Sequence, residues 1–192
     1  TFTDANGTVP TTALVTEVMR AISYSNSNNN PPASVTIDAI INDANVAPAQ
    51  GLGAALTDTT SLVVNITPTN DPPTATEMNT AEAFTEDGAG FVLTPIVISD
   101  VDSANVTATL TLSDSAAGTM STGTSNAVSS TFNAGAWTAT GALADVNTLL
   151  AAITFTPTAD YDQDFTITTS VDDGAATITG SKAVTVTSVQ DA

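Results

Sequence analysis

The sequence predicts an all-β protein built from antiparallel β-sandwich domains in tandem. Threonine alternates with apolar residues in several short stretches, such as residues 106–112, and this period of two is typical of strands with one buried face. Apolar residues make up 42% of the 192 residues, which is enough for a folded core. This length fits one large domain or two ordinary ones.

The expected elements follow from this alternation. The stretches that predict strands most clearly are residues 62–66, 106–112, 153–155, 165–167 and 183–187. Residues 91–98 are more continuously apolar and predict a central strand. The stretch 113–130 is rich in Ser, Thr, Gly and Ala and predicts loop with short strand pieces. Short helical turns are expected at residues 12–20 and 143–150, the second capped by Asp145.

The chain contains an internal repeat. Residues 13–24 align with residues 144–155, and residues 61–71 align with residues 181–191. The first copy carries roughly ten extra residues near 45–55, which we expect to form a loop between two strands. Self-similarity of this kind indicates a tandem array.

The two copies differ in what precedes the shared part. Residues 74–140 belong to the second copy alone. We therefore expect residues 72–192 to form a complete sandwich, and residues 1–71 to be the C-terminal half of an interrupted one. Two explanations stay open: the sequence begins part-way through a domain, or the domain is interrupted by an insert or completed by another chain. A half-sandwich alone would expose its apolar face, at a cost of about 25 cal/mol per Å².

The charge balance excludes several functions. Twenty Asp and Glu face two bases, Arg20 and Lys182, for a net charge of −18. Nucleic acid is not expected as a partner because phosphate binding needs Lys and Arg. Membrane insertion is not expected, since no apolar run approaches the ~20 residues that span a bilayer. The absence of Cys and His argues against disulfides and against common transition-metal sites.

The carboxylates cluster in short turns between the expected strands. Because successive antiparallel strands alternate in direction, the acidic turns fall at the two ends of the sandwich. Clusters of carboxylate and amide oxygens without Lys or Arg to neutralise them predict bound Ca²⁺ at both ends. The plain alternative is that Asp is ordinary in turns. The predicted ligands are Asn70, Asp71, Asp100, Asp102, Asp172 and Asp173 beside the entering linker, and Glu86, Asp87, Asp160, Asp162 and Asp191 at the other end.

The order of these motifs resembles the cadherin-like repeats of giant bacterial surface proteins, especially the extender repeats of RTX adhesins. The motifs are a Pro-x-Asn-Asp-Pro-Pro linker at 68–73, Glu-Asp-Gly at 86–88, Ser-Asp-x-Asp at 99–102, Phe-Thr-Pro and Asp-Tyr-Asp within 155–162, and Val-Asp-Asp-Gly at 171–174. The resemblance implies an Ig-like or cadherin-like sandwich, stiffened by calcium. It also implies secretion to the surface of a Gram-negative bacterium.

The first copy departs from this pattern. It has no Glu-Asp-Gly equivalent, and Asn28, Asn29 and Asn30 stand where the second copy has its Asp-Tyr-Asp motif. Asn carbonyl oxygens bring less charge to calcium, so we expect a weaker junction at Asp71. Interrupted domains that carry a ligand-binding insert are known in the family, and residues 1–71 resemble the return half of one.

The leading hypothesis is therefore a calcium-dependent extender that contacts neighbouring domains of the same adhesin. The alternative is a binding or self-associating module, either a homodimer through the half-domain or a sugar site that uses Trp137 or Tyr161. We expect Trp137 to lie in the core instead. An enzyme is not expected: His and Cys are absent, and neither a Gly-x-Ser-x-Gly elbow nor a phosphate loop is present.

Overall fold

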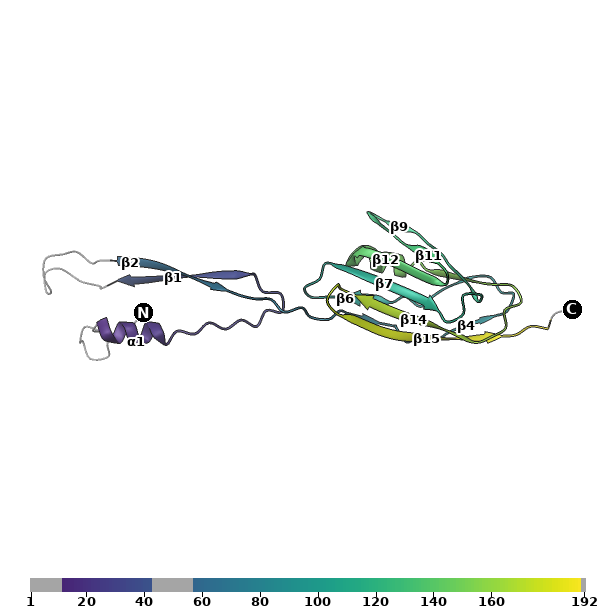
Figure 1. Cartoon of the computed structure of the whole chain (residues 1–192), viewed down its shortest axis with the longest axis horizontal. Coiled ribbons are helices and arrows are strands. Elements are labelled where there is room, and N and C mark those ends of the chain that lie inside the picture. The colour runs from purple at the N-terminus through teal and green to yellow at the C-terminus, as the bar shows by residue number, and fades with distance from the viewer. Residues whose placement is uncertain (1–11, 43–56, 191–192) are drawn as a thin grey trace.

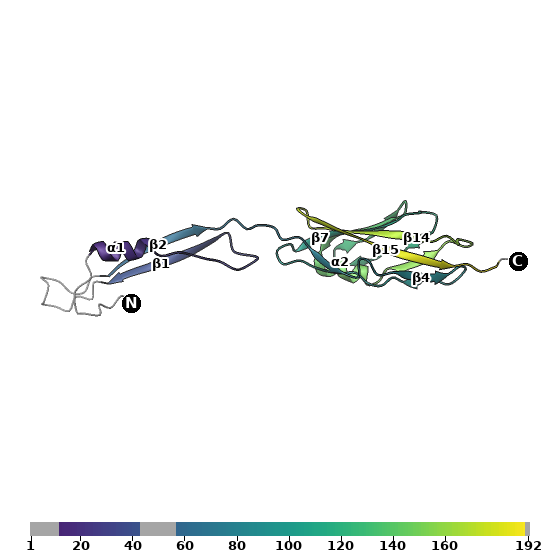
Figure 2. The same cartoon turned by 90° about the horizontal axis from the view of Figure 1, so that it is seen from below.

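The computed structural model describes residues 12–42 and 57–190. The chain forms two parts arranged end to end (Figure 1; Figure 2). The first part contains α1 (Thr12–Arg20), β1 (Ser34–Asn42) and β2 (Thr57–Asn65). An extended linker connects it to a β-sandwich, and the chain leaves the sandwich at the opposite end.

The sandwich has a six-stranded sheet on one side. Its strand order is β11 (Thr131–Asn133), β12 (Ala136–Ala142), β7 (Asn105–Leu112), β14 (Phe165–Asp172), β15 (Thr177–Thr187) and β4 (Glu82–Thr85). Neighbouring strands run antiparallel except for β15 and β4, which are parallel.

Shorter strands form the other side. One group is β5 (Phe91–Val92), β13 (Thr154–Pro157) and β8 (Gly118–Met120), and the second is β3 (Thr74–Thr76) with β6 (Val97–Ser99). A small hairpin, β9 (Thr124–Ser125) and β10 (Val128–Ser129), and the helix α2 (Leu143–Leu150) complete this part. The prediction of an all-β sandwich is therefore confirmed.

The alternation that predicted the strands also builds the core. In β7, Val106, Ala108, Leu110 and Leu112 are buried while the threonines between them are not. Burying one such aliphatic side chain stabilises the fold by about 1.5–3 kcal/mol. The strands predicted at 62–66, 106–112, 153–155, 165–167 and 183–187 all have observed counterparts.

Phenylalanine rings join the layers. Phe155 on β13 and Phe165 on β14 have ring centroids 5.5 Å apart, and Phe84 and Phe91 pack beside them. Because β13 and β14 belong to different sheets, these contacts hold the two sides of the sandwich together. Aromatic pairs at this separation contribute about 0.5–1.5 kcal/mol beyond their burial.

The central strand predicted at residues 91–98 is wrong. The chain forms β5 and then β6, which lie in different groups of strands. Between them the backbone N–H of Thr94 donates to Glu82 Oε1 at 2.9 Å instead of to a strand. Pro95 follows and has no N–H for a ladder. Leu93, Ile96 and Ile98 of this segment are buried, whereas Val92 and Val97 are exposed, so its continuous apolar character does not mark a strand buried on both faces.

The two helices are observed at 12–20 and 143–150 as predicted, but the predicted cap at Asp145 is wrong. Ala142 occupies the N-cap position and makes no side-chain cap bond. Asp145 lies in the first turn, where its Oδ1 accepts hydrogen bonds from Ser125 Oγ (2.8 Å) and Asn126 Nδ2 (2.6 Å). The acid therefore fastens the β9–β10 hairpin to α2.

A buried ion pair links β15 to β4. Lys182 Nζ lies 3.1 Å from Glu82 Oε1, and both side chains are buried. The same ammonium donates to the Thr80 carbonyl at 3.4 Å, and Thr94 supplies two donors to the carboxylate. The sequence marked Lys182 as one of two bases but gave no sign of this partner, which is 100 residues away.

The first part repeats the hairpin of the sandwich. Strands β1 and β2 pair antiparallel along their whole lengths, with Val35 opposite Val64. The aligned strands β14 and β15 pair Phe165 with Val184 in the same way. The two hairpins therefore share one register. The division into an interrupted repeat (1–71) and a complete one (72–192) stays a prediction, and the loop expected near 45–55 lies outside the described residues.

Candidate functional site

The entry end of the sandwich, where the linker arrives, gathers most of the first predicted ligand set. The linker, the β6–β7 turn and the β14–β15 turn meet there. Asn70 Nδ2 donates to Asp173 Oδ2 at 2.9 Å, and the backbone N–H of Asp71 donates to Asp102 Oδ2 at 3.0 Å. Residues more than 30 positions apart are thus brought together as the strand tracing predicted.

The β6–β7 turn holds two partly satisfied carboxylates. Asp100 Oδ1 accepts the backbone N–H groups of Asp102 (3.0 Å) and Ser103 (2.7 Å). The other oxygen of Asp100 is buried and has no hydrogen-bond partner. Asp102 Oδ1 is buried and unpartnered in the same way. Each carboxylate therefore presents one oxygen that the protein itself leaves unsatisfied.

The β14–β15 turn uses its acids differently. Asp172 is engaged within its own turn, by Gly174 N at 2.8 Å and by the Thr177 hydroxyl. Asp173 Oδ1 accepts Ala175 N (2.7 Å) and Ala176 N (2.6 Å). The hydrogen bond from Asn70, and then those from the backbone of the turn, lower the pKa of Asp173 below its ordinary value. These hydrogen bonds favour the ionised form of the Asp173 carboxyl group.

Asn30 also reaches the entry end, although the motif pattern did not rank it among the predicted ligands. Its Nδ2 donates to the carbonyl of Val101 at 3.4 Å, across 71 residues of sequence. The signal was present in the repeat alignment, where residues 28–30 match the Asp-Tyr-Asp motif of the second copy. The first part therefore contacts the sandwich next to Asp100 and Asp102.

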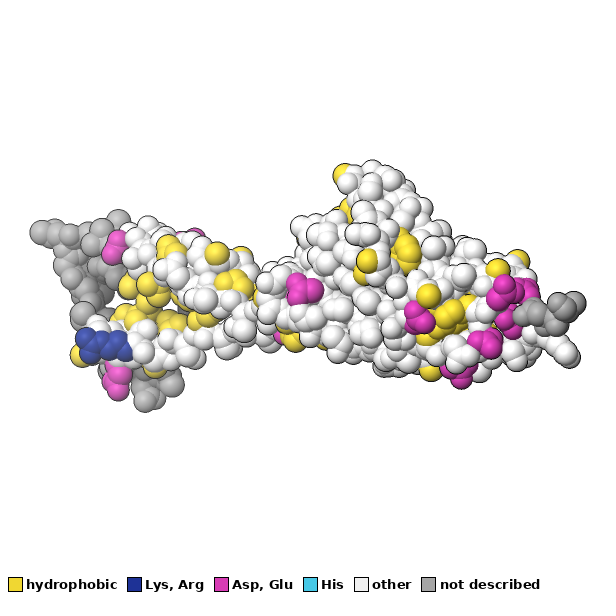
Figure 3. All heavy atoms as spheres, turned by 45° about the vertical axis from the view of Figure 1, so that its right-hand side comes forward, with side chains coloured by type: hydrophobic (Ala, Val, Ile, Leu, Met, Phe, Trp, Pro, Cys, Tyr) yellow, Lys and Arg dark blue, Asp and Glu magenta, His cyan; other side chains and the backbone are white. Residues whose placement is uncertain are grey.

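The exit end, where the chain leaves the sandwich, contains the second set. Glu86 is buried, and its Oε2 accepts the backbone N–H of Val189 at 2.9 Å. Asp87 Oδ1 accepts Asp160 N at 3.4 Å, which joins the turns that carry these two acids. Both turn residues adopt left-handed backbone angles (φ 58° and 57°). Figure 3 shows acidic side chains crowding this end.

Two predicted ligands at the exit end stand apart from this group. Asp162 Oδ1 accepts a hydrogen bond from its neighbour Gln163 Nε2 at 2.5 Å, and no contact joins it to Glu86 or Asp87 among the bonds of the described residues. Asp191 lies outside the described residues. The structure therefore joins the turns of Asp87 and Asp160 at this end, and both Glu86 and Asp164 bind the backbone of the last strand and the chain that follows it, at Val189 and Val186.

Neither end holds a cage of side chains. Within residues 12–42 and 57–190, no group of three or more acidic side chains lies close enough to hold a metal ion by itself. Calcium takes about six to eight oxygens, and many of these come from amide side chains, backbone carbonyls and water. At the entry end, Asp100 and Asp102 fit such a mixed donor set because each has an unpartnered buried oxygen.

The aromatic candidates for a sugar site are engaged elsewhere. Trp137 is fully buried, and its Nε1 donates to the Ser121 carbonyl at 3.1 Å, so its predicted place in the core is confirmed. Tyr161 packs edge-on against Phe165, and its hydroxyl donates to Asp114 Oδ2 at 3.1 Å. Burial and the Asp114 carboxylate raise the pKa of Tyr161.

The comparisons with known proteins are sparse. No protein-family model matches the sequence, and no curated protein matches it. Among solved structures, the chain is similar to domains 4 and 5 of the S-layer protein SbsC, with 14% identity and a TM-score of 0.33 over 80% of this chain and 70% of that one. A likeness of this size is no guide to function. Within the described residues, no helix is long and apolar enough to cross a membrane.

Proposed function

We propose that this chain is a calcium-stabilised spacer of a large bacterial cell-surface adhesin, which holds distal binding domains away from the cell. The elongated arrangement of the two parts, with the linker and the departing chain at opposite ends of the sandwich, suits a spacer (Figure 1). The resemblance of the motif order to the extender repeats of RTX adhesins supports the same role.

One observation carries the calcium proposal. Asp100 Oδ2 and Asp102 Oδ1 are buried at the entry end without a hydrogen-bond partner. Burying an ionised oxygen without compensation is costly, and like charges ~4 Å apart repel by about 1 kcal/mol even in water. A bound cation removes both penalties at once. Neither basic side chain of the chain is paired with these carboxylates in the described residues: Lys182 is paired with Glu82 in the core, and Arg20 lies on α1 in the first part.

Calcium suits the donors at this end better than magnesium does. The available groups are carboxylates, amide oxygens and backbone carbonyls on three different loops, and calcium accepts such flexible geometry. Asp100 and Asp102 would hold the ion, with Asp71, Asn70 and Asp173 beside them. When bound, the ion supplies positive charge and a cross-link between the linker and the sandwich.

The exit end is the second candidate site. Glu86 is buried next to the departing chain, and Asp87 and Asp160 are joined by a hydrogen bond. A neighbouring domain would supply further ligands, which makes this site dependent on the rest of the adhesin. Secretion to the cell surface and the lack of enzymatic activity belong to the same proposal, and both stay predictions.

Thermal unfolding with calcium, with magnesium and with chelator tests the proposal. Trp137 is the sole tryptophan and lies in the sandwich core, so its fluorescence follows this part. A site that exists only in the folded state adds about 2.7 kcal/mol of stability at a free calcium concentration 100 times the Kd. We expect calcium, and not magnesium, to raise the Tm.

A double variant, Asp100→Asn with Asp102→Asn, should lose most of the calcium-induced rise in Tm. In chelator it should be more stable than the unaltered chain, because the repulsion between the two carboxylates is removed. Glu17→Gln with Asp58→Asn is the matched control: it removes two charges from the first part of the chain and should respond to calcium like the unaltered protein. The proposal fails if calcium leaves the Tm unchanged, or if both double variants respond equally.

A further inference from the structure

The first part of the chain presents an apolar sheet face that the described residues cover only in part: Val35, Ile37, Ala39 and Val64 are half-buried, and Ile41 and Leu62 are exposed. On β1, Val35, Ile37, Ala39 and Ile41 share one face, and the register places Leu62 and Val64 of β2 on the same face. The other face carries mostly Ser, Thr, Asp and Asn. Such a division is typical of a sheet that buries one side.

The equivalent face in the complete sandwich is buried. Leu62 and Ile41 are 62% and 41% exposed, whereas the aligned Lys182 and Val171 are 0% and 1% exposed. The segment after α1 shows the same contrast: Ile22 and Tyr24 are 58% and 41% exposed, and the aligned Ile153 and Phe155 are 1% and 0% exposed. The first part therefore carries apolar residues at core positions of the repeat, but these residues are exposed.

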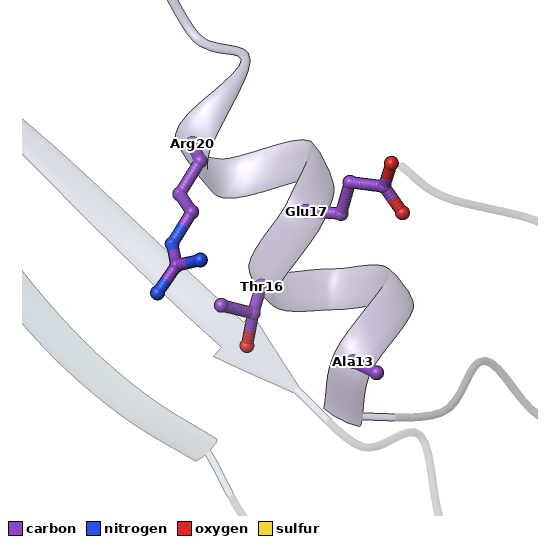
Figure 4. A pocket seen from close by; sticks show the side chains of 4 residues that line it. All are labelled: Ala13, Thr16, Glu17 and Arg20. Carbon is purple, nitrogen blue, oxygen red and sulfur yellow. The ribbon is translucent and has the colours of Figure 1, made fainter.

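The helix α1 does not fill this space. A hollow of about 550 Å³ is lined by Ala13, Thr16, Glu17 and Arg20. Figure 3 shows apolar side chains around an opening between the helix and the hairpin. In Figure 4, Thr16 and Arg20 extend on the side of α1 where the strands lie, and Glu17 extends on the other side.

The complete sandwich shows which elements normally cover this face. On one edge of its hairpin, β14 pairs antiparallel with β7; on the other, β15 pairs parallel with β4. Residues 118–120 and 91–92 flank the strand that contains Phe155. In the described part of the chain, no third strand pairs with β1 or β2. All the missing neighbours correspond to residues 74–142.

We propose that the α1–β1–β2 unit is completed by a half-repeat built like residues 74–142, from a polypeptide segment outside this sequence. It adds an antiparallel strand to the free edge of β1 and a parallel strand to the free edge of β2. The completed unit would lie next to the existing contacts with the sandwich, because Asn30 and Asp71 already bind the β6–β7 turn. It does not depend on bound calcium.

The incoming half-repeat differs from residues 74–142 at one position. Lys182, which pairs with Glu82 in the core, is replaced by Leu62 in the hairpin of the first part. A carboxylate at the Glu82 position would be buried there without a partner, which strongly destabilises a fold. The segment that fits therefore carries an apolar residue at this position.

A second copy of this chain does not meet these requirements. Its own residues 74–142 are already paired, since β7 lies between β12 and β14 and β4 lies against β15. The completing segment must therefore come from elsewhere, and a dimer becomes an outcome that the experiment can detect.

The experiment places a copy of residues 72–142 carrying Glu82→Leu ahead of the full chain through a flexible linker. Hydrogen exchange is then measured in chelator, so that the result is independent of the proposed calcium sites. In the unfused chain, the β1 amides that point away from β2 should exchange fast, and the chain should bind a dye that recognises apolar surface. In the fusion, these amides should slow at least 100-fold and dye binding should fall.

Charge-matched fusions make the test specific. A fused copy that retains Glu82 should protect β1 and β2 poorly, and Leu62→Lys in the same fusion should restore the protection. Two fusions carry a compatible pair at this position: the Glu82→Leu copy with Leu62, and the Glu82 copy with Leu62→Lys. The inference is overturned if neither of them slows exchange of the β1 amides while Trp137 fluorescence shows an intact second sandwich. It is also overturned if the unfused chain sediments as a dimer with protected β1 and β2 amides.

Discussion

At the scale of single residues, similar acids have different surroundings. Asp172 and Asp173 use one oxygen on the backbone of their own turn and the other on a side chain, that of Thr177 or Asn70. Asp100 and Asp102 use only one oxygen each, Asp100 on its own turn and Asp102 on the N–H of Asp71 in the linker, and leave the other buried without a partner. The sequence presents all four as turn acids between strands. What separates them is the surrounding protein, which buries the β6–β7 turn below the linker.

Asn70→Ala should raise the pKa of Asp173 toward the ordinary Asp value, because the Asn70 hydrogen bond is the largest cause of its depression. A carboxylate with a lowered pKa stabilises the fold above its unfolded pKa, and this contribution disappears as the pH falls through the folded pKa. The variant should therefore lose less stability than the unaltered chain between about pH 4 and the folded pKa. NMR titration of the Asp173 carboxyl carbon measures the shift, and Asn133→Ala, on exposed β11, should leave it unchanged.

At the scale of elements, the parallel β4–β15 pair depends on a buried ion pair. Glu82 receives Lys182 and both donors of Thr94, so its oxygens are satisfied where the chain turns from β4 toward β5. The same contacts explain why residues 91–98 do not form one strand. The hydrogen bond from Thr94 to Glu82, which the sequence pattern does not predict, therefore ends β5.

Lys182→Met should lower the free energy of unfolding by about 3–5 kcal/mol, because it leaves the Glu82 carboxylate buried and unpaired. The double variant Lys182→Met with Glu82→Leu should recover most of this loss, since apolar replacement of a buried pair is often close to neutral. Urea unfolding followed by Trp137 fluorescence measures both. Thr185→Val, on an exposed position of β15, should stay within about 0.5 kcal/mol. Equal losses in the single and double variants would contradict the argument.

At the scale of the whole molecule, the linker sets how the first part is oriented relative to the sandwich. Pro72 and Pro73 restrict the backbone where it enters the sandwich, and Pro73 is fully buried. Among the described residues, polar contacts from Asn30, Asn70 and Asp71 join the first part and the linker to the sandwich. Contacts of this kind fix the orientation of the first part relative to the sandwich only weakly, unless a further cross-link is added.

Calcium should therefore stiffen the junction without changing the fold of either part. Small-angle X-ray scattering should show a narrower distribution of interatomic distances, with an unchanged or greater maximum dimension, in calcium than in chelator. Asp100→Asn with Asp102→Asn should give the broad distribution in both conditions. A distribution that broadens in calcium would contradict a spacer role. The far-ultraviolet circular dichroism of the chain serves as the control and should not change.

The sequence by itself determined the strands at 62–66, 106–112, 153–155, 165–167 and 183–187, because alternation with a period of two encodes which face of each strand is buried. It also determined the two helices and the meeting of distant turn acids at the entry end, since antiparallel strands carry their turns to fixed ends of a sandwich. The hairpin register follows from the same cause: Val35 and Phe165 occupy equivalent positions in the two copies, and both lie opposite a valine.

Only the tertiary structure decided which polar atoms are satisfied. The Asp145 contacts with the β9–β10 hairpin, the Glu82–Lys182 pair and the unpartnered oxygens of Asp100 and Asp102 depend on side chains that meet across many residues. Hydrogen bonds and burial require distances within a few tenths of an ångström, and a one-dimensional pattern of residue types does not contain those distances. Likewise, the repeat alignment showed that residues 74–140 have no counterpart in the first copy, and the structure showed the apolar face that this leaves open.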